Sequence, residues 1–167
     1  MNILAQVIGF IALIFIVLSY QAVDKKKFLL IQIFANIFFG LQYLVLSAFS
    51  AFASSMISLF RTIIFFKFEK DNKKANIFVL GFFEILIFVF GMITFDGVIS
   101  LVPICIAAAY TYGTWQKNLK ITYLIGVVAS FLWIFYNFYV GAYVSIIGSL
   151  FELFSSFIGL IRLNIKK

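Results

Sequence analysis

Histidine is absent from this chain of 167 residues, and cysteine occurs once, as Cys105. The absence of histidine removes the commonest general base and the commonest metal ligand of proteins. A single cysteine excludes an internal disulfide and a metal cluster held by several thiolates. No pair of acids at helical spacing and no glycine-rich phosphate loop is present either. The sequence therefore predicts that the protein is not an enzyme and that it holds no cofactor and no metal.

Charged residues are also few, at 11% of the chain, whereas 65% of the residues are apolar. Soluble domains are about half apolar and about a quarter charged. A soluble fold of this length could not bury so much phenylalanine, isoleucine and leucine, so lipid must serve as part of the solvent. The net charge of +7 forms no basic stripe of the kind that binds nucleic acid. The expected partner is the lipid bilayer, and the sequence leaves open whether the protein forms homo-oligomers.

Seven apolar stretches divide the chain, each about as long as a helix must be to cross the hydrocarbon core. Ser47-Ala48 and Gly141-Ala142 are the only separators of two pairs of stretches, which predicts tight helical hairpins rather than two very long helices. We therefore predict an all-α, polytopic membrane protein with seven transmembrane helices. The predicted spans are Ile3–Tyr20, Phe28–Leu46, Phe49–Phe66, Ile77–Thr94, Val98–Trp115, Ile121–Val140 and Tyr143–Leu163.

The thirteen basic residues all fall on one side of the membrane if the N-terminus lies outside and the C-terminus inside. The turns of the other side then carry only Asp96. This pattern follows the positive-inside rule, and with no targeting presequence it predicts a bacterial plasma (inner) membrane protein with a cytoplasmic C-terminus. The basic residues are Lys25, Lys26, Lys27, Arg61, Lys67, Lys70, Lys73, Lys74, Lys117, Lys120, Arg162, Lys166 and Lys167.

A shift of 94 residues places the first three spans on the last three without a gap. Polar residues then coincide, as a stripe on one helical face in each copy. The matched pairs are Ser55 with Ser149, Ser58 with Glu152, and Thr62 with Ser156. We predict one membrane domain, residues 1–167, built from two three-helix repeats, 3–66 and 98–163, and a linker helix, 77–94. A three-span unit followed by one more span keeps both repeats in the same orientation, and parallel repeats of this kind bind substrate between them.

Glu152 lies at mid-membrane depth, where a carboxylate costs about 2.5–3.5 kcal/mol or more. One interpretation is a solute or proton site. The alternatives are a neutral glutamate bonded to serines, or an ion pair with Arg61. Glu84, at the middle of the linker helix, has the same cost, and a structural hydrogen bond to a repeat is the favoured interpretation there.

Trp133 lies deeper than membrane tryptophans usually do, and Asn137 shares its helical face. Trp133 and Asn137 either line a pocket or pack in the core of the helix bundle. Pro103 removes a backbone hydrogen bond from the fifth span, which predicts a kink that serves as a hinge or is static. The predicted substrate-binding residues are Ser55, Ser58, Trp133, Tyr136, Asn137, Ser149 and Glu152.

Several short segments, in order along nearly the whole chain, resemble the YgjV-type proteins of the bacterial inner membrane. More distantly, the 3+1+3 plan is similar to the sugar-transporting SWEET and SemiSWEET proteins and the PQ-loop group, with Trp133 and Tyr136 at the place of their Trp-x-x-Tyr. Ser149 replaces the asparagine of their pocket. Pro103 matches their proline, and its counterpart in the first repeat is Gly9, which the resemblance implies as a second hinge. The segments are Ala5-Gln6 with Gly9, Ser54 with Phe60-Arg61-Thr62, Leu101-Val102-Pro103, Asn137-Phe138 with Gly141, and Ile161-Arg162.

Two functions remain open at this stage. The first is transport of a small polar solute, sugar-like or metabolite-like, by alternating access between the two repeats. The second is a sensor, regulatory or assembly protein of the membrane that transports nothing. The second function predicts a dry core in which Glu152 is paired with Arg61, whereas the first predicts a polar cavity between the repeats.

Overall fold

The computed structural model describes residues 2–165, and within them the chain is α-helical apart from short connections and one 3-10 turn. Six of the helices are long and apolar enough to cross a membrane, and the seventh, α4, is a shorter apolar helix of 17 residues. The all-α membrane fold predicted from composition is therefore confirmed. The elements are α1 (Ile3–Tyr20), α2 (Lys25–Val45), α3 (Phe49–Lys70), α4 (Ile77–Ile93), η1 (Val98–Ser100), α5 (Leu101–Trp115), α6 (Leu119–Tyr139) and α7 (Tyr143–Ile165).

Asparagine and aspartate side chains determine where four of these helices begin. Asn2, Asp24, Asn76 and Asn118 each precede a helix and accept a hydrogen bond from a backbone N–H of its first turn. Such a cap satisfies one of the donors that a helix start leaves free. The caps explain why α2 and α6 begin two to three residues before the apolar runs used to predict them.

The two predicted hairpin turns are confirmed. α2 ends at Val45 and α3 begins at Phe49, and α6 and α7 are joined in the same way. Ser47 and Gly141 hold the turns in the left-handed region, with φ of 56° and 74°. The left-handed region is open to glycine and strained for most other residues. Each turn reverses the chain with only three connecting residues.

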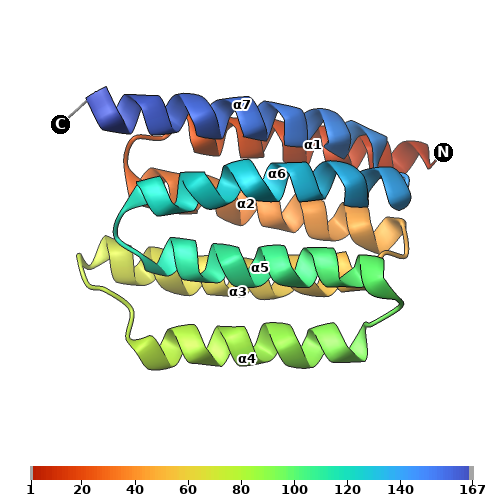
Figure 1. Cartoon of the computed structure of the whole chain (residues 1–167), viewed down its shortest axis with the longest axis horizontal. Coiled ribbons are helices and arrows are strands. Elements are labelled where there is room, and N and C mark those ends of the chain that lie inside the picture. Colours follow the sequence, from red (N-terminus) through yellow and green to blue (C-terminus); the bar gives the residue numbers. More distant parts are fainter. Residues whose placement is uncertain (1, 166–167) are drawn as a thin grey trace.

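The helices form two layers (Figure 1). α1, α2 and α3 lie side by side in one layer, and α7, α6 and α5 cover them in the other. Contacts between α1 and α7 and between α3 and α5 join the layers along both edges, so six helices form a closed ring. α4 lies outside the ring against α3 and α5. Phe83 and Ile87 of α4 pack there on Ile57, Ile104 and Ala107.

Polarity is distributed in the reverse of a soluble protein. Large apolar side chains cover the outside, such as Phe78 and Met92 of α4, which are 80% and 77% exposed. Serines, threonines, amides, Arg61 and Glu152 lie inside instead. Exposure of so many apolar side chains to water would be unfavourable. In the hydrocarbon of a bilayer the same side chains can face the lipid, and the polar groups must face inward. The surface contacts the lipid bilayer.

The connections α1–α2, α3–α4 and α5–α6 all lie at the end of the ring where α7 ends, which we name the basic end (Figure 1). Most basic residues are in or next to these connections, as predicted, but Arg61 is not. It lies near the middle of α3 and is 4% exposed. Arg61 therefore lies inside the ring of helices and not among the charges of the basic end. Lys166 and Lys167 lie outside the described residues.

Candidate functional site

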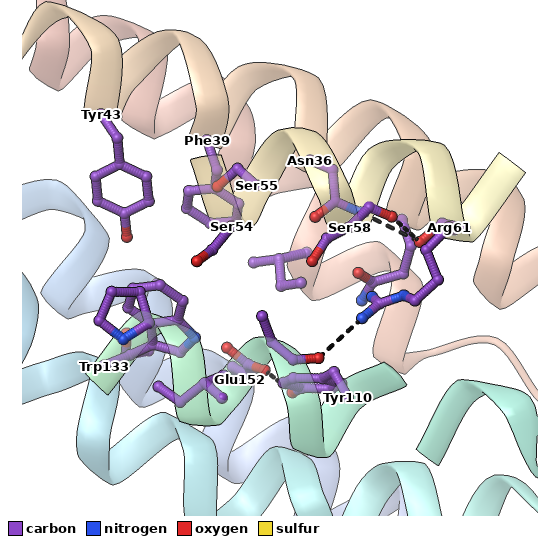
Figure 2. A pocket seen from close by; sticks show the side chains of 18 of the residues that line it. Asn36, Phe39, Tyr43, Ser54, Ser55, Ser58, Arg61, Tyr110, Trp133 and Glu152 are labelled. Carbon is purple, nitrogen blue, oxygen red and sulfur yellow. Dashed lines mark hydrogen bonds between the residues drawn. The ribbon is translucent and has the colours of Figure 1, made fainter. Parts of the chain in front are cut away.

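A cavity of about 80 Å³ lies between the two layers, and all six helices of the ring line it. One water molecule needs about 10–15 Å³ of such space, so several waters or a small solute fit. Figure 2 shows side chains from both layers pointing into this space. The lining is partly polar, with serines and Arg61 on α3, amides on α2, and Glu152 on α7.

The cavity gathers six of the seven residues predicted to bind a solute. They are Ser55, Ser58, Trp133, Asn137, Ser149 and Glu152. Tyr136 lies elsewhere, in a groove of about 550 Å³ at the end opposite the basic end. Its hydroxyl is 3.3 Å from the hydroxyl of Ser50. The Tyr136 ring packs edge-on against Tyr43 and Trp133 without lining the cavity itself.

Three hydroxyls on α3 are unused within the structure. Ser54, Ser55 and Ser58 line the cavity, and their side chains make no hydrogen bond to the part of the chain described. Ser149 of α7 differs, because its hydroxyl donates to the carbonyl of Ser145 at 3.0 Å and accepts from Asn137 at 3.3 Å. The α3 side of the polar stripe is therefore the one free to bind a solute.

Glu152 is held by two tyrosines from two other helices. Its Oε1 accepts a hydrogen bond from Tyr20 of α1 at 2.6 Å and another from Tyr110 of α5, and the two phenol oxygens are themselves within hydrogen-bonding distance. The carboxyl is 7% exposed and also lines the cavity. Phenol donors stabilise a carboxylate and suit a carboxylic acid less well. The three side chains together form a site that can hold or release a proton beside the cavity.

Arg61 does not form the predicted ion pair with Glu152. Its Nη1 donates instead to the carbonyl of Ala107 at 3.1 Å and to the hydroxyl of Thr111 at 2.8 Å, both on α5. The physical reason is that α3 packs against α5, whereas Glu152 faces α1 and α5 from α7. Arg61 and Glu152 are therefore bonded to different partners and not to each other.

Tyr43 and Asn137 line the cavity toward the end opposite the basic end. The Tyr43 hydroxyl donates to Oδ1 of Asn137 at 2.7 Å, which links α2 to α6 across the two layers. The Trp133 ring stacks on Tyr43, with centroids 5.7 Å apart, and the Tyr136 ring meets both edge-on. Beyond this aromatic layer lies the groove that contains Ser50.

Three aromatic rings pack together toward the basic end of the ring of helices. Tyr20, Phe28 and Tyr123 are nearly fully buried and contact one another, with ring centroids 5.5 to 5.9 Å apart. Farther out, Lys25 bonds the carbonyl of Gln116 and lies 3.6 Å from Glu69. These contacts join the connections of the basic end.

The two predicted hinges lie at different places in their helices. Pro103 is in the first turn of α5, directly after the 3-10 turn, where a helix needs no N–H donor, and it lines the cavity. Gly9 lies in a continuous α1, away from the cavity. A Cβ on Gly9 would come within 2.3 Å of the Gln42 amide nitrogen. Gly9 therefore allows Gln42 to pack between α1 and α7, and the hinge role of both residues stays a prediction.

Several residues of the site were not predicted from the sequence. Tyr20, Tyr43, Tyr110, Gln32 and Asn36 are the main ones. Gln32, Asn36 and Tyr43 follow one another at intervals of four and seven along α2, so their polar stripe was visible in the sequence. No such signal marked Tyr20 or Tyr110, because each is a single tyrosine near the end of an apolar run.

The family model of the Imp-YgjV bacterial inner membrane proteins matches residues 3–167. The chain belongs to this family. Its place in the bacterial inner membrane and the YgjV-type resemblance are thereby established. Neither a curated protein nor a solved structure matches the chain. Among the described residues, no group of three or more histidine, cysteine, aspartate or glutamate side chains could hold a metal ion.

Proposed function

We propose that this protein is a transporter that moves a small polar solute across the inner membrane by alternating access. Two three-helix units, α1–α3 and α5–α7, would rock against each other, with α4 as the linker that also crosses the membrane. The observation that carries the proposal is a partly polar cavity between the two layers, lined by all six helices of the ring. Such a cavity between two units is where transporters of repeated architecture bind their substrate.

The proposed repeat is supported by the positions of the helix ends. α2 spans Lys25–Val45 and α6 spans Leu119–Tyr139, so both their ends are offset by 94 residues. The left-handed turn residues Ser47 and Gly141 have the same offset. The contacts between the layers agree with the repeat as well. If α1 corresponds to α5 and α3 to α7, then the contact of α1 with α7 corresponds to the contact of α5 with α3, and both are present.

Tyr43 and Asn137 support the symmetry independently, because they are 94 residues apart and contact each other. In a two-fold arrangement, a residue can touch its own equivalent only close to the axis. The proposed axis therefore passes between α2 and α6, through the aromatic layer around Tyr43. Opening toward the outside would separate these two helices and break the Tyr43–Asn137 hydrogen bond.

Uptake into vesicles that contain the purified protein tests the proposal. Labelled glucose, glycine and lactate serve as probes, with empty vesicles as the blank. We expect saturable uptake of at least one probe, and a decrease of about tenfold or more in Glu152→Gln, because glutamine can neither carry the charge nor exchange the proton of the carboxyl that lines the cavity. Asp71→Asn, an equal change of charge on the exposed end of α3, is the matched control.

Two results would contradict the proposal in different ways. Uptake of every probe at the level of empty vesicles argues against transport. Undiminished uptake by Glu152→Gln removes Glu152 from the mechanism and leaves the cavity as the path.

The proposed orientation places the basic end in the cytoplasm, as the positive-inside rule predicts. Lys73 and Asp96 are exposed at the two opposite ends of α4. In a Cys105→Ala background, we expect Asp96→Cys to react with an impermeant maleimide in cells with intact inner membranes. Lys73→Cys should react only after the membrane is permeabilised. The reverse pattern of labelling would invert the assignment.

A further inference from the structure

Arg61 has unused hydrogen-bond donors beside the cavity. Nη1 makes both hydrogen bonds that Arg61 donates to the described residues, and these bonds fix the guanidinium against α5. Nε is buried and has no partner there. Figure 2 shows the side chain reaching from α3 into the cavity, between Asn36 and Tyr110. The edge formed by Nε and Nη2 is the edge that binds a carboxylate through two parallel hydrogen bonds.

The charge of Arg61 is also unpaired at close range. In the described part of the chain, the one ion pair within 4.0 Å joins Lys25 and Glu69. Glu84 on α4 interacts electrostatically with Arg61 without forming an ion pair, and Glu152 bonds to the tyrosines instead. A buried charge without a partner costs several kcal/mol. An anion bound in the cavity would therefore offset the energetic cost of the buried, unpaired guanidinium of Arg61.

The rest of the cavity determines what kind of anion fits. Phe39, Tyr43 and Trp133 lie at the end of the cavity away from Arg61 (Figure 2). Ser54 and Ser58, with free hydroxyls, line the space between. A bare inorganic anion would fill the Arg61 end and leave the aromatic end without a partner. An organic molecule with one anionic group and a small body would contact both ends.

Glu152 restricts the charge further. Its carboxyl lines the same cavity and accepts two phenol hydrogen bonds. A second negative charge on the solute would meet no second cation among the lining residues, and whenever Glu152 is ionised this charge would also be repelled. The site therefore favours a solute with one negative charge over a dianion.

We propose that the cavity binds a small organic monocarboxylate, whose carboxylate pairs with Nε and Nη2 of Arg61 while its body lies toward Ser54 and the Trp133 end. This inference names the solute class of the proposed transporter and so rests on that function. Arg61 is the residue that distinguishes charged from neutral solutes. Ser54 and Ser58 bind hydroxyl or amino groups on the body of the molecule.

The test compares carboxylates with amides of the same shape. The purified protein in nanodiscs is unfolded by heat with acetate, lactate or benzoate, and then with acetamide, lactamide or benzamide. A ligand that binds only the folded state raises the Tm in proportion to its affinity. We expect at least one carboxylate to raise the Tm at millimolar concentration, and its amide and inorganic phosphate to have no effect.

Two variants place the effect at Arg61. Arg61→Gln should bind the stabilising carboxylate about tenfold or more weakly, as for the loss of hydrogen bonds to a charged group. Arg61→Lys keeps the charge without the planar fork and should also bind it more weakly. Arg162→Gln removes the same charge at the exposed end of α7 and should bind like the wild type.

Three outcomes would overturn the proposal. They are no stabilisation by any of the three carboxylates, equal stabilisation by a carboxylate and its amide, and stabilisation by phosphate alone. The comparison of acid with amide uses the wild-type protein, so it decides the question even if an Arg61 variant does not fold. Binding of lactate without its uptake would uphold this inference and contradict transport. Uptake of glucose with no carboxylate binding would support transport and contradict the monocarboxylate as its solute.

Discussion

Replacement of Glu152 by leucine is expected to lower the free energy of unfolding by about 1–3 kcal/mol, whereas replacement by glutamine leaves it nearly unchanged. The difference comes from Tyr20 and Tyr110, whose hydroxyls both donate to Glu152 in the wild type. Leucine offers no acceptor. One phenol can then donate to the other, since their oxygens are close enough, but the second is left with a buried donor that has no partner.

Glutamine preserves this arrangement because both phenols bond the same oxygen, Oε1. The amide oxygen of glutamine can take that place and accept both hydrogen bonds. Glu152→Gln therefore removes the charge and the exchangeable proton without removing the acceptor. This makes it the variant in which a loss of uptake is informative, because the helices around the cavity remain joined.

Thermal unfolding in nanodiscs checks the prediction for both variants. Adding both Tyr20→Phe and Tyr110→Phe to Glu152→Leu serves as the control, because together they remove the two phenol donors that leucine leaves with too few acceptors. The two phenylalanine substitutions should destabilise the wild type and have little effect, or a favourable one, in the leucine background. Equal stability of the leucine and glutamine variants would show that the phenol hydrogen bonds do not hold this part of the ring.

The helices themselves were predictable because hydrocarbon imposes a length on them. Ile3–Tyr20 was predicted with the ends that the structure has, and Tyr143 and Phe49 were predicted as helix starts. Errors occurred where a side chain rather than the apolar run sets the boundary. Asp24 and Asn118 start α2 and α6 earlier because they cap the first turn.

The polar stripe on α3 and α7 was predictable, but its partners were not. Helical spacing tells which residues share a face, and it placed Ser55, Ser58 and Glu152 toward the cavity. It does not tell which helix lies opposite that face. Glu152 meets tyrosines from α1 and α5, and Arg61 bonds to α5, so the ion pair between them, one of the alternatives weighed for Glu152, does not form.

Arg61 illustrates the same limit for the topology rule. The positive-inside rule counts basic residues near helix ends and assumes that they lie in loops. An arginine two turns inside a helix is compatible with the bilayer if it faces a polar cavity within the bundle. The ring of six helices supplies that cavity, and only the packing of the two layers shows it.

Substitution of Gly159 by alanine is expected to destabilise the protein by about 1–3 kcal/mol, the usual cost of extra atoms in a packed core. A Cβ at Gly159 of α7 would lie 2.4 Å from Cε2 and 2.6 Å from Cδ2 of the Tyr123 ring on α6. Carbon atoms that are not bonded pack at about 3.5–4.0 Å. The ring or the helix must therefore move, and small residues are what allow membrane helices to approach so closely.

The Tyr123 ring has little freedom to move. Its hydroxyl donates to the carbonyl of Ala22 at 2.6 Å, and its faces and edges contact Tyr20 and Phe28. A shift of the ring would disturb its packing with Tyr20 and Phe28. It would also reach the Tyr20 hydroxyl, and through it Glu152. We therefore expect Gly159→Ala to lower both the Tm and the uptake of any probe that the wild type moves.

Gly81 of α4 provides the matched control, since nothing lies within 4 Å of the position that its Cβ would occupy. Alanine is favoured over glycine in a helix by about 1 kcal/mol, so Gly81→Ala should be neutral or stabilising. The same gain in helix propensity applies to Gly159→Ala, and the expected net destabilisation of that variant already includes it. If both variants unfold at the same temperature, α6 and α7 are packed less closely at Gly159 than its short distances to the Tyr123 ring imply. The Tyr123 ring would then be able to move aside for the added methyl group.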